Sequence, residues 1–213
     1  MSMNKLALIP GHKESSQGAV NRDSGVTEWG FNDELIMDIK NRLICLPDWD
    51  APSDISPYKY PYQIRIFHRT STITDLVKRI NAWNPDLAIE FHCNSYKEKW
   101  IARLLRFEKE ATGTEMLLSK FHKPKRLPSE FRVQCAMLAD KICGAINIEY
   151  RELKYRGRWH PKGGYFLNKT MCRAIIAELF FIDNNSDLAK ANENKPAMVQ
   201  TITDWIVNYF KEK

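Results

Sequence analysis

Apolar and polar positions along the chain repeat with two periods, one typical of strands and one typical of helices. Short apolar runs predict buried strands, and apolar residues every three or four positions predict amphipathic helices. The expected strands cover residues 6–9, 63–68, 86–91, 114–118 and 174–182. The expected helices cover residues 28–43, 73–83, 129–146 and 196–210. Because the strands alternate with helices, we expect an α/β fold with a mostly parallel sheet and helices on both faces.

Length and composition indicate one globular domain. At 213 residues the chain is long enough for a single α/β domain and short for two, so residues 1–213 are expected to form one domain. The apolar run near the N-terminus is short and ends at Pro10, which argues against a signal peptide. No stretch approaches the roughly 20 apolar residues that cross a bilayer. We therefore expect a cytoplasmic protein without a transmembrane segment.

The charge and the cysteines narrow the function only partly. The net charge is +6, and basic residues are concentrated in residues 120–126 and 151–162. Such a surface attracts polyanions, so a solvated face, a nucleic-acid site and a surface for the anionic bacterial envelope all remain open. The five cysteines are scattered without a C-x-x-C spacing, which argues against disulfides and a cysteine zinc finger. Strand alternation points Cys93 away from the side of His92, so we expect a packed thiol rather than a nucleophile.

Two histidines and two glutamates occur at places where a hydrolytic metal site would need them. His12 and His92 follow expected strands, Glu178 lies in an apolar strand, and Glu28 begins a helix. The carboxyl ends of parallel strands meet at one sheet edge, where ligands collect. Two histidines and a glutamate, with a second glutamate beside them, fit a zinc site that keeps one open position.

Helical register distinguishes the two glutamates of the first expected helix. Glu28 shares a stripe with Leu35 and Ile39 and therefore points inward, whereas Glu34 falls on the wet face. An inward carboxylate needs a cation or hydrogen-bond donors, and a metal is a good candidate. Taken singly, a histidine after a strand is more often structural, and Glu178 could instead pair with a buried arginine such as Arg69 or Arg79.

The order of these motifs resembles one known family. The matching segments are Pro10-Gly11-His12, Gly18-Ala19-Val20, Gly25-x-x-Glu28-x-x-x-Asn32, His68-Arg69, Phe91-His92-x-Asn94, Gly113-Thr114-Glu115 and Ala177-Glu178-Leu179-x-Phe181-Ile182-x-Asn184. Together they resemble the zinc-dependent N-acetylmuramoyl-L-alanine amidases of the His-Glu-His metal type. Those enzymes are peptidoglycan hydrolases with a twisted sheet and flanking helices. The likeness runs from about residue 6 to residue 188.

The resemblance implies roles for particular residues. It implies a Zn²⁺ ion held by His12, Glu28 and His92, with water in the fourth position and Glu178 as the catalytic carboxylate that moves the water's proton. It also suggests Asn94 and Glu115 as substrate-binding residues, although Glu115 could equally cap a local turn. His68 is expected to be structural or to support the metal ligands. His122 and His160 are expected at the surface.

Two departures from the family pattern leave alternatives open. Many relatives carry glycines immediately after the first histidine, whereas this chain has Lys13-Glu14-Ser15-Ser16, so Glu14 competes with Glu28 as a ligand. The interval between His92 and Gly113 is longer than expected, and residues 96–112 form a charged, partly helical insertion. That insertion could shape the substrate groove, act as a lid, or be a solvated helix.

The resulting hypothesis is a monomeric zinc amidase that cleaves the amide between N-acetylmuramic acid and L-alanine in peptidoglycan. Without a signal peptide or a separate wall-binding domain, the chain resembles a bacteriophage endolysin whose basic surface supplies affinity for the anionic bacterial envelope. No nucleic-acid partner is expected, since no nucleic-acid-binding motif is present. The alternatives are another zinc amidohydrolase, of the N-formylglutamate deacylase or carboxypeptidase type, and a non-catalytic module that binds nucleic acid or envelope.

Overall fold

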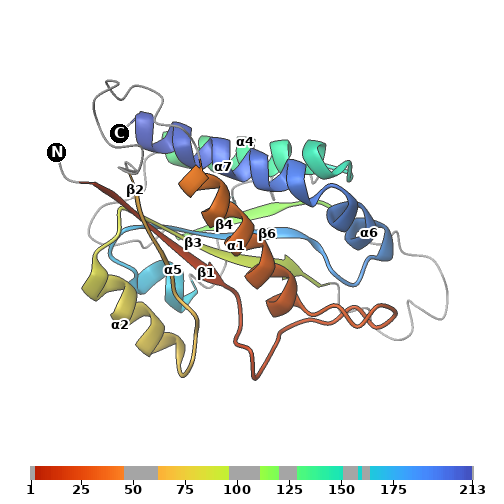
Figure 1. The fold of residues 1–213 in the computed structure, drawn as a ribbon, viewed down its shortest axis with the longest axis horizontal. Helices are drawn as coiled ribbons and strands as arrows, with labels where there is room; N and C mark the ends of the chain where they lie inside the picture. The colour runs from red at the N-terminus through yellow and green to blue at the C-terminus, as the bar shows by residue number, and fades with distance from the viewer. Residues whose placement is uncertain are drawn as a thin grey trace.

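The expected strands join in one sheet in the computed structural model, which describes residues 3–45, 62–95, 111–119, 129–150, 158–159 and 164–212. The sheet has six strands in the order β2-β1-β3-β6-β4-β5. Their bounds are Asn4–Pro10 (β1), Tyr62–Ile66 (β2), Leu87–Asn94 (β3), Glu115–Leu118 (β4), Arg158–Trp159 (β5) and Arg173–Phe181 (β6). Figure 1 shows β3 and β6 side by side at the middle of the sheet.

Strand directions divide the sheet into two parts. The strands β2, β1, β3 and β6 run parallel to one another, as the alternation of strands and helices predicts. The strand β4 runs antiparallel to β6, and β5 is parallel to β4. The carboxyl ends of β1, β3 and β6 therefore meet at one edge, where the amino end of β4 also lies. This edge is where chemistry is expected in a sheet of this kind.

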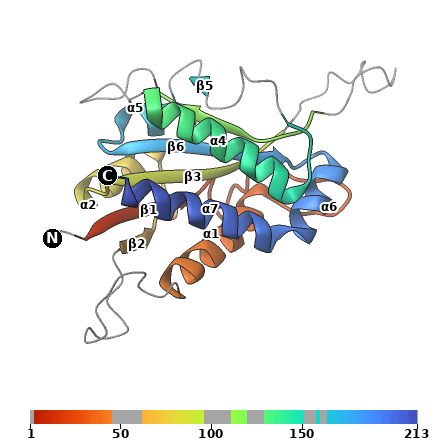
Figure 2. The same cartoon turned by 90° about the horizontal axis from the view of Figure 1, so that it is seen from above.

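Helices cover both faces of the sheet. The described helices are Glu28–Cys45 (α1), Ile73–Trp83 (α2), Ser129–Ile146 (α4), Tyr165–Lys169 (α5), Asn185–Glu193 (α6) and Lys195–Lys211 (α7). The helices α1, α4 and α7 lie on one face, and α2 and α5 lie on the other (Figure 1). Figure 2 shows α4 and α7 side by side across the first face. The larger apolar core lies under these helices, and a smaller one lies under α2 and α5.

Local signals explain where the helices begin and end. Thr72 caps α2, because its Oγ1 accepts a hydrogen bond from the backbone N–H of Asp75 at 3.2 Å. Asn84 ends α2 in the left-handed conformation with φ 52°. Thr27 accepts from the backbone N–H of Gly30 at 3.2 Å, so it caps α1 as its position in the sequence predicts.

The structure differs from the sequence-based expectations in several bounds. The second strand ends at Ile66 rather than residue 68, and the third continues to Asn94, so His92 lies inside β3 rather than after it. The short elements β5, α5 and α6 were not expected. Residues 96–110 of the charged insertion, most of the two basic segments, His122 and His160 lie outside the described residues. Among the described residues, every helix is too short or too polar to span a bilayer.

Candidate metal centre

His12 reaches the sheet edge because the chain leaves β1 in a tight turn. It follows Pro10 and Gly11 and has a left-handed backbone with φ 67°. The backbone N–H of Gly11 donates to the carbonyl oxygen of Phe91 at 2.7 Å, which ties this turn to β3. A Cβ at Gly11 would lie 2.5 Å from Cε1 and 2.6 Å from Nδ1 of His92. Only glycine allows the backbone to approach the His92 ring so closely.

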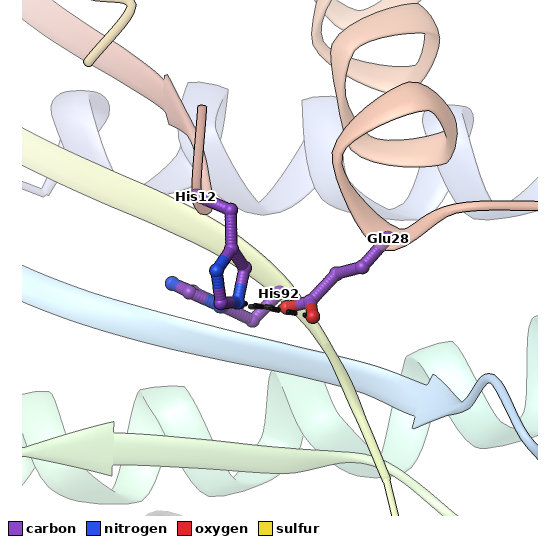
Figure 3. A group of neighbouring side chains, drawn as sticks. All are labelled: His12, Glu28 and His92. Atoms are coloured by element: carbon purple, nitrogen blue, oxygen red, sulfur yellow. Dashed lines mark hydrogen bonds and ion pairs between the residues drawn. The ribbon is translucent and has the colours of Figure 1, made fainter. Parts of the chain in front are cut away.

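Glu28 enters the same place from the first turn of α1 (Figure 3). Its side chain is buried, and its residue is only 3% exposed. The backbone N–H of Ala19 donates to Oε2 at 2.9 Å, and the backbone N–H of Cys93 donates to Oε1 at 3.2 Å. A Cβ at Gly18 would collide with both Glu28 and His12, so this loop position also requires glycine. The inward direction predicted for Glu28 by helical register is confirmed.

The side chains of His12, Glu28 and His92 converge on one point. His12 Nε2 lies 3.1 Å from Glu28 Oε2, and His92 Nδ1 lies 2.7 Å from Glu28 Oε1. One ligand atom from each residue falls within 4.8 Å of the others, and this is the metal-capable group found among the described residues. Figure 3 shows the Glu28 carboxylate turned toward both imidazole rings. Two nitrogens and a carboxylate therefore share one small volume.

The charge of this group favours a cation. Burial would raise the pKa of Glu28, but hydrogen bonds with His12 and His92 outweigh it and lower the pKa to about 2. Burial opposes protonation of His92, yet Glu28 and Glu90 raise its pKa well above the ordinary value. Glu28 is thus ionised at neutral pH and attracts positive charge to its neighbours. This is the electrostatic condition that a metal cation needs.

A second carboxylate lies beside the group on the neighbouring strand. Glu178 of β6 is directly opposite His92 of β3, and Glu115 of β4 is directly opposite Glu178. Because side chains alternate between the faces of a sheet, these paired residues point to the same side. Burial raises the pKa of Glu178 to about 7, with His92 opposing and the negative charges of Glu28, Glu115 and Glu90 adding to the rise. A carboxyl group with that pKa can both accept and release a proton near neutral pH.

Glu14, the rival ligand in the sequence, is not one of the three converging residues. Glu14 is exposed in the short turn closed by Lys13 and Ser16, away from the converging group. Among the described residues, no ion pair joins Glu178 to Arg69 or Arg79, and Arg79 donates to the carbonyl oxygen of His68 instead. His68 lies on the surface, with Nε2 2.7 Å from Asp33 Oδ1.

The two residues that follow His92, Cys93 and Asn94, lie in different surroundings. Cys93 is buried on the opposite face, 3.8 Å from Asn32 Oδ1, and burial raises the pKa of its thiol well above the ordinary value. The prediction of a packed thiol is confirmed. Asn94 ends β3, where its Oδ1 accepts from the backbone N–H of Ser95 at 2.9 Å. It does not belong to the converging group.

Sequence reasoning missed Glu90, which lies two residues before His92 on the same side of β3. It is 4% exposed, and its Oε1 is 3.6 Å from His92 Nε2. The signal was present, since period-two alternation places residues 90 and 92 together. A single glutamate inside a strand matches no motif, so the sequence alone gives Glu90 no role.

The donor set defines a class of site. Two histidine nitrogens and one carboxylate, with an adjacent carboxyl group of raised pKa, are the usual protein contribution to a mononuclear hydrolytic metal centre. Its place at the carboxyl ends of parallel strands is also usual for α/β enzymes. The fold and site together therefore describe a metal-dependent hydrolase.

Comparison with known proteins identifies the family. Residues 6–208 match the family model described as N-acetylmuramoyl-L-alanine amidase. The chain belongs to this family, and it is an enzyme that acts on peptidoglycan as an N-acetylmuramoyl-L-alanine amidase. A non-catalytic binding module is thereby excluded. No curated protein sequence matches the chain.

Solved structures share the fold at low sequence identity. The catalytic domain of the amidase CwlV from Bacillus (Paenibacillus) polymyxa aligns with a TM-score of 0.72 and 16% identity, covering 99% of this chain and 100% of that one. An amidase from Clostridium difficile 630 gives 0.71 and 16%, covering 99% and 98%. The catalytic domain of CD27L, an endolysin that targets Clostridia difficile, gives 0.63 and 19%, covering 96% and 97%.

Proposed function

We propose that His12, Glu28 and His92 hold one Zn²⁺ ion and that Glu178 is the catalytic carboxylate of the amidase. The observation that carries this proposal is the convergence of the three ligand atoms within 4.8 Å around an ionised, buried carboxylate. The residues fit a metal, because Gly11 and Gly18 leave room for close packing of the ligands where a Cβ would intrude. Histidine nitrogen and carboxylate oxygen are both ordinary zinc ligands.

The proposed chemistry divides the work between the metal and the chain. A bound zinc ion lowers the pKa of water from about 15.7 to about 7 and polarises a carbonyl group. Glu178 takes the proton that the attacking water loses and delivers it to the departing amine of L-alanine. In the metal-free protein, burial raises the pKa of Glu178 to about 7, so the group is neither permanently ionised nor permanently protonated near neutral pH.

The proposed substrate-binding roles of Asn94 and Glu115 differ in accessibility. Asn94 is partly exposed at the end of β3, two residues after His92, and can donate or accept a hydrogen bond. Glu115 is 1% exposed and lies opposite Glu178. Because Glu115 is buried, we expect it to act on the substrate indirectly, through the charge of Glu178, and not by broad direct contact.

Mass spectrometry of digested peptidoglycan tests the bond that is cut. The purified protein with zinc should release peptides headed by a free L-alanine amine and leave lactyl-muramic acid ends on intact glycan. Treatment with a chelator should stop this release, and zinc should restore it. Cut glycans, cut cross-links, or efficient hydrolysis of N-formylglutamate in place of peptidoglycan would contradict the proposal.

We further propose that the enzyme is a monomeric bacteriophage endolysin that stays in the cytoplasm of the producing cell until the membrane is opened. Its likeness to the CD27L catalytic domain supports this role. Expression inside the host should leave cells intact, and co-expression with a membrane-permeabilising protein should lyse them. Fractionation should recover the protein from the cytoplasm. Recovery from the cell wall of growing, unlysed cells would instead support a role in wall maintenance.

We also propose that the enzyme binds the anionic bacterial envelope partly through its positive charge, and the net charge of +6 supports this. Retention on whole cell walls should decrease as salt rises from about 0.05 M to 0.5 M, because screening weakens exposed charge interactions. Hydrolysis of a small soluble muropeptide should change much less. Equal salt dependence in the two assays would remove the basic surface from a role in targeting.

A further inference from the structure

Glu90 gives His92 a second carboxylate neighbour. It precedes His92 by two residues in β3, so both side chains project from the same face of the sheet. His92 Nδ1 lies 2.7 Å from Glu28 Oε1, and His92 Nε2 lies 3.6 Å from Glu90 Oε1. Each nitrogen of one imidazole ring therefore faces a different carboxylate. The two contacts define how the ring is turned.

The protonation of the ring links these contacts to metal binding. A neutral imidazole has one nitrogen with a free lone pair and one that carries a proton, and only the former can bind a metal. His92 Nδ1 is the nitrogen that faces Glu28, one of the three converging residues. Its Nε2 is directed to Glu90. A metal at Nδ1 thus requires the proton to be at Nε2, on the side of Glu90.

We propose that Glu90 is a positioning residue, which accepts a hydrogen bond from Nε2–H of His92 and keeps Nδ1 available for the metal. This inference rests on the proposed metal centre. A histidine that binds a metal generally donates a hydrogen bond from the N–H of its second ring nitrogen to a carboxylate, a carbonyl group or water, and this contact sets the tautomer and the ring orientation. The separation of 3.6 Å exceeds an ordinary hydrogen bond by about half an ångström, so the proposed bond requires the two side chains to move together by that amount when the metal binds.

The surroundings of Glu90 favour this partner over others. A carboxylate that is 4% exposed needs a donor or a cation to offset its lost hydration. Glu178 and Glu115, its acidic neighbours on the same face, cannot supply positive charge. The contact with His92 can. On its other edge the ring is confined by the backbone of Gly11, where a Cβ would be 2.6 Å from Nδ1. Glu90 and Gly11 therefore limit the ring from two sides.

Measurements of zinc affinity distinguish the positioning role of Glu90 from a general effect of removing a nearby negative charge. The affinity of the full chain would be measured by competition with a chromophoric chelator, without substrate. Glu90→Ala should weaken zinc binding about 10- to 100-fold, the usual range for lost support of a ligand. Glu90→Gln keeps an acceptor oxygen and should lose less than about fivefold. Glu115→Gln, the matched control, removes a buried carboxylate from the same face without touching His92 and should change affinity less than about twofold.

The tautomer itself can be observed in the unmutated protein, so the inference does not depend on whether a variant folds. Nitrogen-15 NMR of the zinc-loaded protein should show the His92 proton on Nε2 and the metal on Nδ1. A proton on Nδ1, or equal zinc affinity in Glu90→Ala and the wild type, would overturn the role of Glu90. If the wild type binds no zinc, the metal centre fails and this inference fails with it. Zinc binding without any effect at residue 90 would refute this inference alone.

Discussion

The two faces of the strand β3 differ in the side chains that they carry: one face is apolar, and the other carries ionisable groups. Ile89, Phe91 and Cys93 point to the face covered by α1, α4 and α7, where all three are buried in the larger core. Glu90 and His92 alternate with them and point to the other face, beside Glu178 of β6. One face gains stability from apolar burial, while the other collects groups that are costly to bury.

The difference shows why the site needs the sheet. Apolar packing on one face holds the strands β3 and β6 in register, and that register sets His92 directly opposite Glu178. The carboxylates on the second face repel one another, which contributes to the raised pKa of Glu178. Stability from the first face thus offsets an acidic arrangement that could not persist in a flexible loop.

Removal of the carboxylate at the centre of the site should have the largest effect. Glu28→Ala leaves His12 and His92 without the negative charge that joins them, so zinc affinity should fall more than about 100-fold and turnover should become undetectable. Glu14→Ala, the exposed control two residues after His12, should keep both. Metal analysis and muropeptide turnover measure the result. Stoichiometric zinc in Glu28→Ala together with its loss in Glu14→Ala would reverse the ligand assignment.

Replacement of the proton carrier should affect chemistry while sparing the metal. Glu178→Gln keeps the shape of the side chain but cannot transfer a proton, so turnover should fall by about 10² to 10⁴ while zinc remains bound. Zinc content, circular dichroism and muropeptide turnover would be measured on the same preparation. Near-normal turnover per folded molecule would contradict the catalytic role of Glu178.

The same substitution should change stability in the direction set by the pKa. In the metal-free protein the pKa of Glu178 is about 7, above the ordinary 4.5, so its folded form retains the proton longer than its unfolded form. The stabilising contribution of protonated Glu178 to the free energy of unfolding is fully present below about pH 4.5. This contribution is lost as the pH rises through 7. Between pH 4.5 and pH 8, the free energy of unfolding of metal-free Glu178→Gln should therefore increase relative to that of the wild type by up to about 3 kcal/mol. Denaturant titrations at both pH values test this, and a pH-independent difference would refute it.

A substitution on the apolar face should have the smallest effect on chemistry. Cys93 is adjacent to His92 but packs into the core near Asn32. Cys93→Ala should leave turnover within about threefold of the wild type and cost about 1 kcal/mol of unfolding free energy through the small cavity. Turnover and thermal unfolding give the two values. A loss of activity as large as that of Glu178→Gln would mean that the two faces are not separate.

Much of this arrangement follows from local signals in the sequence. The helix α2 begins and ends at the predicted residues, because Thr72 caps its start and Asn84-Pro85 ends it. The apolar runs of β1, β3 and β6 are recognisable because strands covered on both faces are almost continuously hydrophobic. The inward direction of Glu28 follows from its register in α1.

Other features depend on contacts that sequence periodicity does not encode. The antiparallel direction of β4 is set by pairing with β6, and a four-residue apolar run is compatible with either direction. His92 lies inside β3 because pairing with β6 continues through an irregularity between His92 and Asn94. The short helix α5 has too few turns to show a period. A role for Glu90 can be inferred only when the orientation of the His92 ring is known.

Anomalous X-ray scattering at the zinc absorption edge, from crystals of the zinc-loaded protein, tests the metal centre most directly. It locates the ion independently of activity. We expect one zinc peak in contact with His12 Nε2, a carboxylate oxygen of Glu28 and His92 Nδ1, with Glu178 beside it on the neighbouring strand. A peak held by other residues, or none at this place after loading with zinc, would contradict the account.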